Sequence, residues 1–109
     1  MLAPGDVVLC DFVGAQGTKW RPAVVISTAR YLANGIDVVV GELTTQLQKA
    51  SLPTSYALQD WSAAGLHQRS VFRCYFSMAI QADCQPVGRL SDRDWQEVQA
   101  RLRLALAVT

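Results

Sequence analysis

Two side chains that can act together on a phosphate group stand at the ends of predicted strands. Arg21 opens one strand directly after a loop that contains glycine, and Thr44 closes the next strand along the chain. In a small, strongly bent sheet the strand ends lie close together at the rim, so we expect this guanidinium and this hydroxyl near each other. Arginine offers charge and several donors to phosphoryl oxygens, and threonine adds a hydrogen bond. A solvated strand edge for Arg21 and ordinary strand propensity for Thr44 are the alternative interpretations.

Other residues of catalytic type fit structural roles better. His67 is the only histidine and follows Gly65 in a predicted loop, where a surface or capping role is the simpler interpretation and a general base is the alternative. Asp92 and Asp94 fall in the first turn of a predicted helix, where negative charge suits the helix dipole. The sequence contains no phosphate-binding glycine loop, no G-x-S-x-G motif and no H-E-x-x-H motif, which excludes the commonest catalytic motifs.

The three cysteines indicate neither disulfides nor a metal site. Cys10, Cys74 and Cys84 are an odd number, with no C-x-x-C motif and no nearby histidine cluster. This pattern argues against a disulfide framework and against zinc. Cys10 and Cys74 lie in apolar stretches, where a buried thiol behaves as a small hydrophobic side chain. We therefore expect no metal ion and no cofactor.

The elements that must position Arg21 and Thr44 are short strands. Apolar, β-branched runs separated by turn signals predict four strands and two weaker ones. The four are 7–12, 23–26, 36–43 and 70–76, and the weaker ones are 52–58 and 86–90. Residues 13–20, which include two glycines, are predicted as a flexible loop.

Local signals add a bulge, a turn and a helix. Gly41 is a candidate bulge within its strand, and Asp60 would cap a single helical turn over 61–64. A capping box over 91–94 begins a C-terminal helix, in which several apolar side chains share one face. These side chains are Trp95, Val98, Leu102, Ala105 and Leu106. The elements together predict a mainly β fold with a C-terminal helix (α+β), in which the helix covers one face of a small, bent sheet or partly open barrel.

Length and charge limit the class of protein. The chain has 109 residues, of which 50% are hydrophobic and 17% charged, which predicts a single domain over 1–109 and excludes general disorder. A formal net charge of +1 excludes a broad electrostatic surface for nucleic acid or membrane. Between residues 12 and 59, however, the chain has four basic residues and only two acidic ones. The low charge fraction also favours an apolar surface that a partner covers.

Targeting signals are not apparent in the sequence. The N-terminus has no basic region followed by an apolar core, and no apolar run is long enough to cross a bilayer. We expect a cytoplasmic protein with no membrane partner.

An ordered set of motifs resembles the PemK/MazF family of type II toxin–antitoxin ribonucleases. The motifs are G-D-V-V at 5–8, R-P-A-V-V-I-S at 21–27, L-T-T-Q at 43–46, L-Q-D-W-S-A-A-G-L at 58–66, S-V at 70–71 and G-R-L-S-D at 88–92. They span nearly the whole chain, and their order is more specific than any one of them. The resemblance implies a small SH3-like barrel of about five to seven strands with one C-terminal helix.

The resemblance also implies an activity, partners and site residues. The activity is metal-independent cleavage of single-stranded RNA at short sequences, which arrests growth. The implied partners are a second copy of the chain, a cognate antitoxin and, for the toxin–antitoxin complex, DNA. Arg21 and Thr44 correspond to the catalytic arginine and threonine of the family. The candidate RNA-binding residues are Lys19, Trp20, Thr45, Gln46 and Lys49, although Trp20 fits packing under the loop equally well.

Two departures from the family bear on cleavage rate and base preference. Many active members carry a polar Gln-x-Arg-Thr-like stretch where this chain has Phe76-Ser77-Met78-Ala79, and the loop over 13–20 is short. Arg73 is a candidate substitute for the missing arginine, with an outward-pointing side chain as the alternative. A non-catalytic module on the same barrel, which binds RNA or poisons a protein such as a gyrase, is therefore the alternative function.

Overall fold

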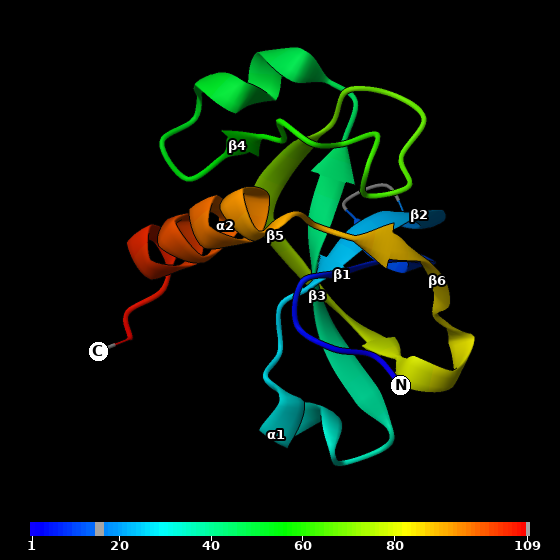
Figure 1. Ribbon diagram of the computed structural model, residues 1–109. Helices are drawn as coiled ribbons and strands as arrows, with labels where there is room; N and C mark the ends of the chain where they lie inside the picture. The colour runs from blue at the N-terminus through cyan, green and yellow to red at the C-terminus, as the bar shows by residue number, and fades with distance from the viewer. Residues whose placement is uncertain (15–16, 109) are drawn as a thin grey trace.

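The computed structural model describes residues 1–14 and 17–108, which form one curled sheet with a C-terminal helix (Figure 1). Its six strands are β1 (Asp6–Gly14), β2 (Gly17–Val25), β3 (Asp37–Thr44), β4 (Tyr56–Ala57), β5 (Val71–Ile80) and β6 (Gln85–Arg89). They lie in the order β4-β5-β3-β2-β1-β6, and neighbouring strands are antiparallel. The helices are α1 (Ala29–Leu32) and α2 (Asp92–Ala105), with 3₁₀ helices η1 (Leu47–Ser51) and η2 (Gln81–Asp83). The predicted mainly β fold with its C-terminal helix is confirmed.

The two faces of the sheet carry separate apolar cores. Successive residues of a strand point to opposite faces, so Val7 and Val24 belong to one core while Val8 and Val25 belong to the other. Val98 of α2 is part of the first core, and Figure 1 shows α2 along one side of the sheet. Burying a valine side chain contributes about 1.5–3 kcal/mol, which explains why β-branched runs on both faces hold the strands in place.

The curl of the sheet brings β1 against β5, although the two are not neighbours in the strand order. The rings of Phe12 and Tyr75 stack with their centroids 5.6 Å apart. The backbone N–H of Val13 donates to Ser77 Oγ at 3.4 Å. These contacts close a half-barrel around the second core.

The predicted loop over 13–20 is wrong in its described part. β1 continues to Gly14 and β2 begins at Gly17, with Phe12 paired to Lys19 and Val13 to Thr18. Residues 17–20 are all exposed. Their sequence therefore lacks the alternation of apolar and polar residues by which a half-buried strand is predicted. Residues 15–16 of the predicted loop lie outside the described residues.

The segment before β5 is less regular than predicted. The weak strand over 52–58 shrinks to β4 at the sheet edge. Residues 61–64 form a hydrogen-bonded turn and no helix, with Ala64 N–H donating to Asp60 O at 3.1 Å. The Asp60 carboxylate accepts hydrogen bonds from Ser91 and Arg93 at the start of α2, so it is not available to cap this turn.

The C-terminal helix begins where the sequence predicts. Ser91 is its N-cap, with Oγ accepting from the Asp94 N–H at 3.3 Å. Val98 is buried, but Ala105 and Leu106 are exposed. The predicted apolar face is therefore wrong at its C-terminal end: α2 ends at Ala105, and the backbone of Leu106 is already extended. Within the described residues, no helix is long and apolar enough to cross a membrane.

Candidate functional site

Arg21 lies inside β2 and does not open the strand, contrary to the prediction. β2 pairs with β1 over 17–24, but it pairs with β3 only over 23–25. Pro22 stands just outside that short pairing, where the N–H that proline lacks is not needed. The half of β2 that carries Arg21 therefore has an unpaired edge towards β3, and the Arg21 side chain reaches across it.

A buried carboxylate, Glu42, accepts hydrogen bonds from two arginines. Arg21 Nη1 donates to Glu42 Oε2 at 2.9 Å, and Arg73 Nη1 donates to Glu42 Oε1 at 3.2 Å. The Glu42 side chain is 6% exposed, whereas those of Arg21 and Arg73 are 33% and 26% exposed. The three side chains carry a net charge of +1, and most N–H donors of each guanidinium are not used in these bonds. Two guanidinium groups therefore lie near the surface above one shared acid.

The strand register explains why these three side chains meet. Ala23 pairs with Glu42, and Glu42 pairs with Arg73; paired residues point to the same face. Arg21 lies two residues before Ala23 and shares that face. The register between β3 and β5 shifts between Gly41, which pairs with Phe76, and Glu42, which pairs with Arg73. The extra residues, 74–75, therefore lie on β5, and the bulge predicted within the strand of Gly41 occurs in its partner strand instead. A Cβ at Gly41 would lie 2.5 Å from the Phe72 ring, so only glycine lets β3 pass at this point.

Aromatic rings support Arg73 from below. The Arg73 Cζ lies 5.4 Å from the centroid of the Tyr75 ring, within the range of a cation–π interaction. Tyr75 in turn stacks on Phe12 of β1. The Arg73 guanidinium is thus fixed by a carboxylate and by an aromatic platform.

Thr44 lies two residues after Glu42 on β3 and on the same face. It is buried, and its Oγ1 accepts from the Gln46 N–H at 3.2 Å. A hydroxyl that accepts a hydrogen bond keeps its own hydrogen for donation. Among the hydrogen bonds of the described residues, none joins Arg21 to Thr44. Strand register and alternation place both on the face of Glu42.

The candidate RNA-binding residues divide between the two faces. Lys19 is exposed on β2 and shares the face of the two arginines, whereas Trp20 alternates to the opposite face. Thr45 follows the end of β3 and lines a cavity together with Pro22, which is also on that opposite face. Trp20 is 51% exposed, which favours the stacking interpretation over packing. Gln46 is exposed after β3, and Lys49 is half-buried in η1.

His67 belongs to the opposite face. A cavity of about 290 Å³ there is lined in part by Pro22, Thr45, His67 and Gln68. Because it contains no residue of the Arg21–Glu42–Arg73 cluster, His67 is not positioned with the two guanidinium groups. The predicted surface position of His67 is confirmed by its exposure.

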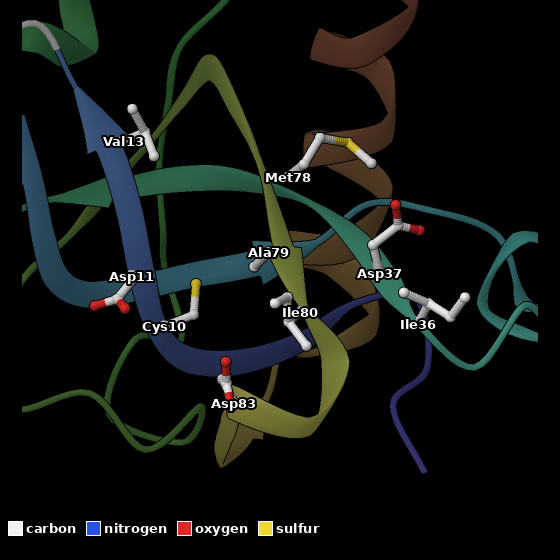
Figure 2. Close-up of a pocket in the computed structure, with 9 residues that line it drawn as sticks. All are labelled: Cys10, Asp11, Val13, Ile36, Asp37, Met78, Ala79, Ile80 and Asp83. Carbon is white, nitrogen blue, oxygen red and sulfur yellow. The ribbon is translucent and has the colours of Figure 1, made fainter.

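A further cavity, of about 370 Å³, lies between β1 and β5 (Figure 2). Asp11 and Asp83 line it together with exposed apolar side chains such as Met78 and Ile80. No lysine or arginine of the described residues lines this cavity, so it does not suit a polyanion.

Cys10 is not a nucleophile for the site, although the register pairs it with Arg21. Burial raises the pKa of Cys10 to about 12, so the thiol stays protonated and inert at neutral pH. The predicted burial of Cys10 is confirmed, whereas Cys74 is only half-buried. In the part of the chain that the structure describes, no group of three or more acidic, histidine or cysteine side chains is arranged to hold a metal ion.

Sequence reasoning misses Glu42. The available signal is a single acid inside the otherwise apolar strand β3, since a buried carboxylate requires partners. The partner Arg73 is 31 residues away, and the register shift between Gly41 and Glu42 decides whether the two side chains meet. Arg73 itself points to its carboxylate partner, so the alternative of a purely outward-pointing side chain is wrong.

The fold and these side chains define a small, curled β-protein with two arginines paired to a buried glutamate, and with a hydroxyl on the same sheet face. A family model described as PemK-like, MazF-like toxin of type II toxin-antitoxin system matches residues 3–106. The chain therefore belongs to this family of toxins, as its motifs predict.

Solved structures with this fold include toxins of the same kind. An endoribonuclease in complex with its cognate antitoxin, from a mycobacterial species, has a TM-score of 0.80 at 19% identity over 100% of this chain and 98% of that chain. MazF (Form-I) from Deinococcus radiodurans has a TM-score of 0.76 at 18% identity, over 98% of this chain and 97% of its own. The Mycobacterium tuberculosis toxin MazF-mt6 also gives 0.76 at 18% identity, over 95% and 98%. Among curated proteins, none matches this sequence.

Proposed function

We propose that this toxin is an endoribonuclease that cleaves single-stranded RNA, mRNA above all, at short sequences and without a metal ion. The observation that carries the proposal is the placement of Arg21 and Thr44 on one face, with the Arg21 guanidinium held by the buried Glu42. The fold match to an endoribonuclease in complex with its cognate antitoxin supports it.

RNA supplies its own nucleophile, so the protein needs only to orient the phosphate and stabilise charge. The 2′-oxygen forms a bond to the adjacent phosphorus, and the bond from phosphorus to the 5′-oxygen breaks with its electron pair going to that oxygen. The 2′-hydroxyl loses its proton to solvent, and the 5′-oxygen takes up a proton. The products are a 2′,3′-cyclic phosphate and a 5′-hydroxyl.

Arg21 and Thr44 have separate roles in this reaction. Arg21 stabilises the negative charge that develops on the phosphoryl oxygens; a guanidinium is a poor acid, so its role is electrostatic. Thr44 donates its hydroxyl hydrogen to a non-bridging oxygen. Lys19 lies on the same face for a neighbouring phosphate. Trp20 points to the opposite face and offers an exposed ring on which a base beyond the edge of β2 can stack.

The remaining candidates would guide the RNA as it leaves this face. Thr45, Gln46 and Lys49 follow β3 into η1, beyond the catalytic threonine. We include a cognate antitoxin and a second copy of the chain among the partners, and place the action in the cytoplasm, where mRNA is the substrate.

The proposal predicts a graded loss of cleavage. In EDTA, wild-type protein fragments a mixed-sequence RNA; Arg21→Ala lowers the rate about 10²–10³-fold, as removal of one transition-state donor does. Thr44→Ala lowers it about tenfold to a hundredfold, because a hydrogen bond to a charged oxygen is lost, and Thr44→Ser retains most of the rate. Arg103→Ala, an exposed change on α2, is the control and leaves the rate unchanged.

Equal cleavage by Arg21→Ala and wild type would contradict the catalytic assignment. Growth arrest that survives both Arg21→Ala and Thr44→Ala would instead support the alternative function, a module that acts without cleaving RNA.

A further inference from the structure

We propose that Arg73 binds the RNA phosphate together with Arg21, and that Glu42 is the positioning residue that holds both guanidinium groups. This inference rests on the proposed function, because it gives two more residues of the same site a role. It makes the site a two-arginine clamp on one phosphodiester, built on β2, β3 and β5.

The geometry favours a clamp because the shared acid uses one oxygen for each arginine. Glu42 Oε2 lies 2.9 Å from Arg21 Nη1, and Oε1 lies 3.2 Å from Arg73 Nη1. Each guanidinium has five N–H donors in a fixed fork, so the donors not bound to Glu42 are available to an anion. Both arginines are more exposed than the acid beneath them, and a phosphate can approach from solvent without displacing Glu42.

Charge and packing also favour a two-arginine clamp. Without Glu42, two like charges would have to share a small area, and each guanidinium would lose the partner that fixes its direction. With it, the cluster retains a net charge of +1, enough to attract a phosphodiester. Tyr75 lies under Arg73, so the second arginine is held from two sides.

A buried acid between two arginines is poorly suited to be a general base. Each of its two oxygens already accepts a hydrogen bond from an arginine. The acid is also covered, with 4% of the residue exposed, while the reacting oxygens would meet the arginines first. Positioning of the guanidinium groups is the role that fits both facts.

The first test measures binding without cleavage. A 2′-O-methyl oligonucleotide of mixed sequence lacks the nucleophile, so its dissociation constant can be followed by fluorescence anisotropy over a range of salt concentrations. Arg73→Gln is expected to weaken binding about tenfold and to reduce the slope of log K against log[salt] by about 0.7, the value for one phosphate contact on a single strand. Arg103→Ala, an exposed arginine on α2, is the charge-matched control and leaves the slope unchanged.

The second test separates positioning from binding. Glu42→Gln keeps the side-chain shape but raises the net charge of the cluster to +2. We expect kcat on mixed-sequence RNA to fall at least tenfold while KM and the dissociation constant do not rise. Glu42→Asp keeps the charge on a shorter side chain, so its kcat is expected to lie between those of Glu42→Gln and wild type. Thermal unfolding of each variant identifies any that fails to fold. If Glu42→Gln does not fold, the kcat of Glu42→Asp and the salt slope of Arg73→Gln test the inference.

Three outcomes would overturn the inference. An unchanged salt slope in Arg73→Gln would mean that Arg73 does not contact phosphate. A higher kcat in Glu42→Gln would mean that Glu42 competes with the phosphate and blocks the site. A lower melting temperature in Glu42→Gln with unchanged kcat would mean that the acid has only a structural role. If wild type cleaves no RNA, the proposed function fails, and the salt slopes still decide whether Arg73 binds phosphate.

Discussion

Two buried carboxylates have different partners and therefore different uses. Glu42 is bound by two charged arginines that face solvent, an arrangement open to an external anion. Asp94 is completely buried and accepts from the Tyr56 hydroxyl at 2.6 Å and from the N–H groups of Gln59 and Asp60 at 3.0 and 2.8 Å. These donors are internal, so Asp94 joins β4 and the following turn to α2 and takes no part in the site.

Removal of the Tyr56 hydroxyl tests this structural role. Tyr56→Phe is expected to lower the free energy of unfolding by about 1.5–3 kcal/mol, because a hydrogen bond to a buried charge is lost. Tyr31→Phe is the matched control: it removes a similar bond to Asp37 at the exposed surface and is expected to change stability by less than about 0.5 kcal/mol. Urea unfolding of both variants measures the difference, and equal losses would contradict the account.

The Tyr56 hydroxyl also gives a pH dependence at the alkaline end. Burial, followed by the hydrogen bond to Asp94, raises the pKa of Tyr56 from 10.0 to about 12. A raised folded-state pKa stabilises the protein below the unfolded value, so this contribution is present below pH 10 and is lost as the pH rises towards 12. The Tyr56→Phe variant lacks it.

Strand pairing decides how much of the chain can be predicted. Apolar runs such as 7–12 and 36–43 predict strands correctly because most of their apolar side chains are buried in the cores on the two faces of the sheet. Residues 17–20 are strand without burial, so no pattern indicates them. The contact of Glu42 with Arg73 depends on the strand register and on its shift between Gly41 and Glu42, which are tertiary properties. Arg21 and Thr44 can be predicted only from local strand signals and from the resemblance.

The junction between the turn at 60–65 and α2 depends on an ion pair. Asp60 accepts two hydrogen bonds from Arg93, at 2.6 and 2.7 Å, and one from Ser91 Oγ at 2.6 Å. The bonds from Arg93, then that from Ser91, lower the pKa of Asp60 from 3.8 to about 2. The sequence places Asp60 as a cap for its own turn, whereas its partners come from an element about 30 residues away.

Acid unfolding tests this junction. A depressed folded-state pKa gives stability that is present above pH 3.8 and is lost as the pH falls towards 2. We expect Asp60→Asn to unfold with a weaker pH dependence than wild type over this window. Asp11→Asn, which removes an exposed acid from β1, is the control and is expected to follow wild type. Parallel acid-unfolding curves for Asp60→Asn and wild type would show that the junction does not depend on this pair.

Charge placement and exposed apolar surface matter more for the whole molecule than its net charge of +1. The two arginines and Lys19 gather on one sheet face, while acidic and apolar side chains line the cavity in Figure 2. Val13, Ile36, Met78 and Ile80 are each more than half exposed there. A monomer rarely leaves such a cluster open to water, which supports the proposed homodimer.

Light scattering after size exclusion tests the dimer. At micromolar concentration we expect twice the chain mass of 11.9 kDa, and an excess of salt should leave the mass unchanged because the contact would be apolar. A mass of one chain would refute the homodimer without affecting the catalytic proposal.

The central claim is that one sheet face cleaves RNA by attack of the 2′-hydroxyl. The most direct measurement is the chemistry of the fragment ends after incubation of wild-type protein with mixed-sequence RNA in EDTA. We expect 2′,3′-cyclic phosphate and 5′-hydroxyl ends, formed far more slowly by Arg21→Ala. Fragments with 3′-hydroxyl and 5′-phosphate ends, or no fragments at all, would contradict the account.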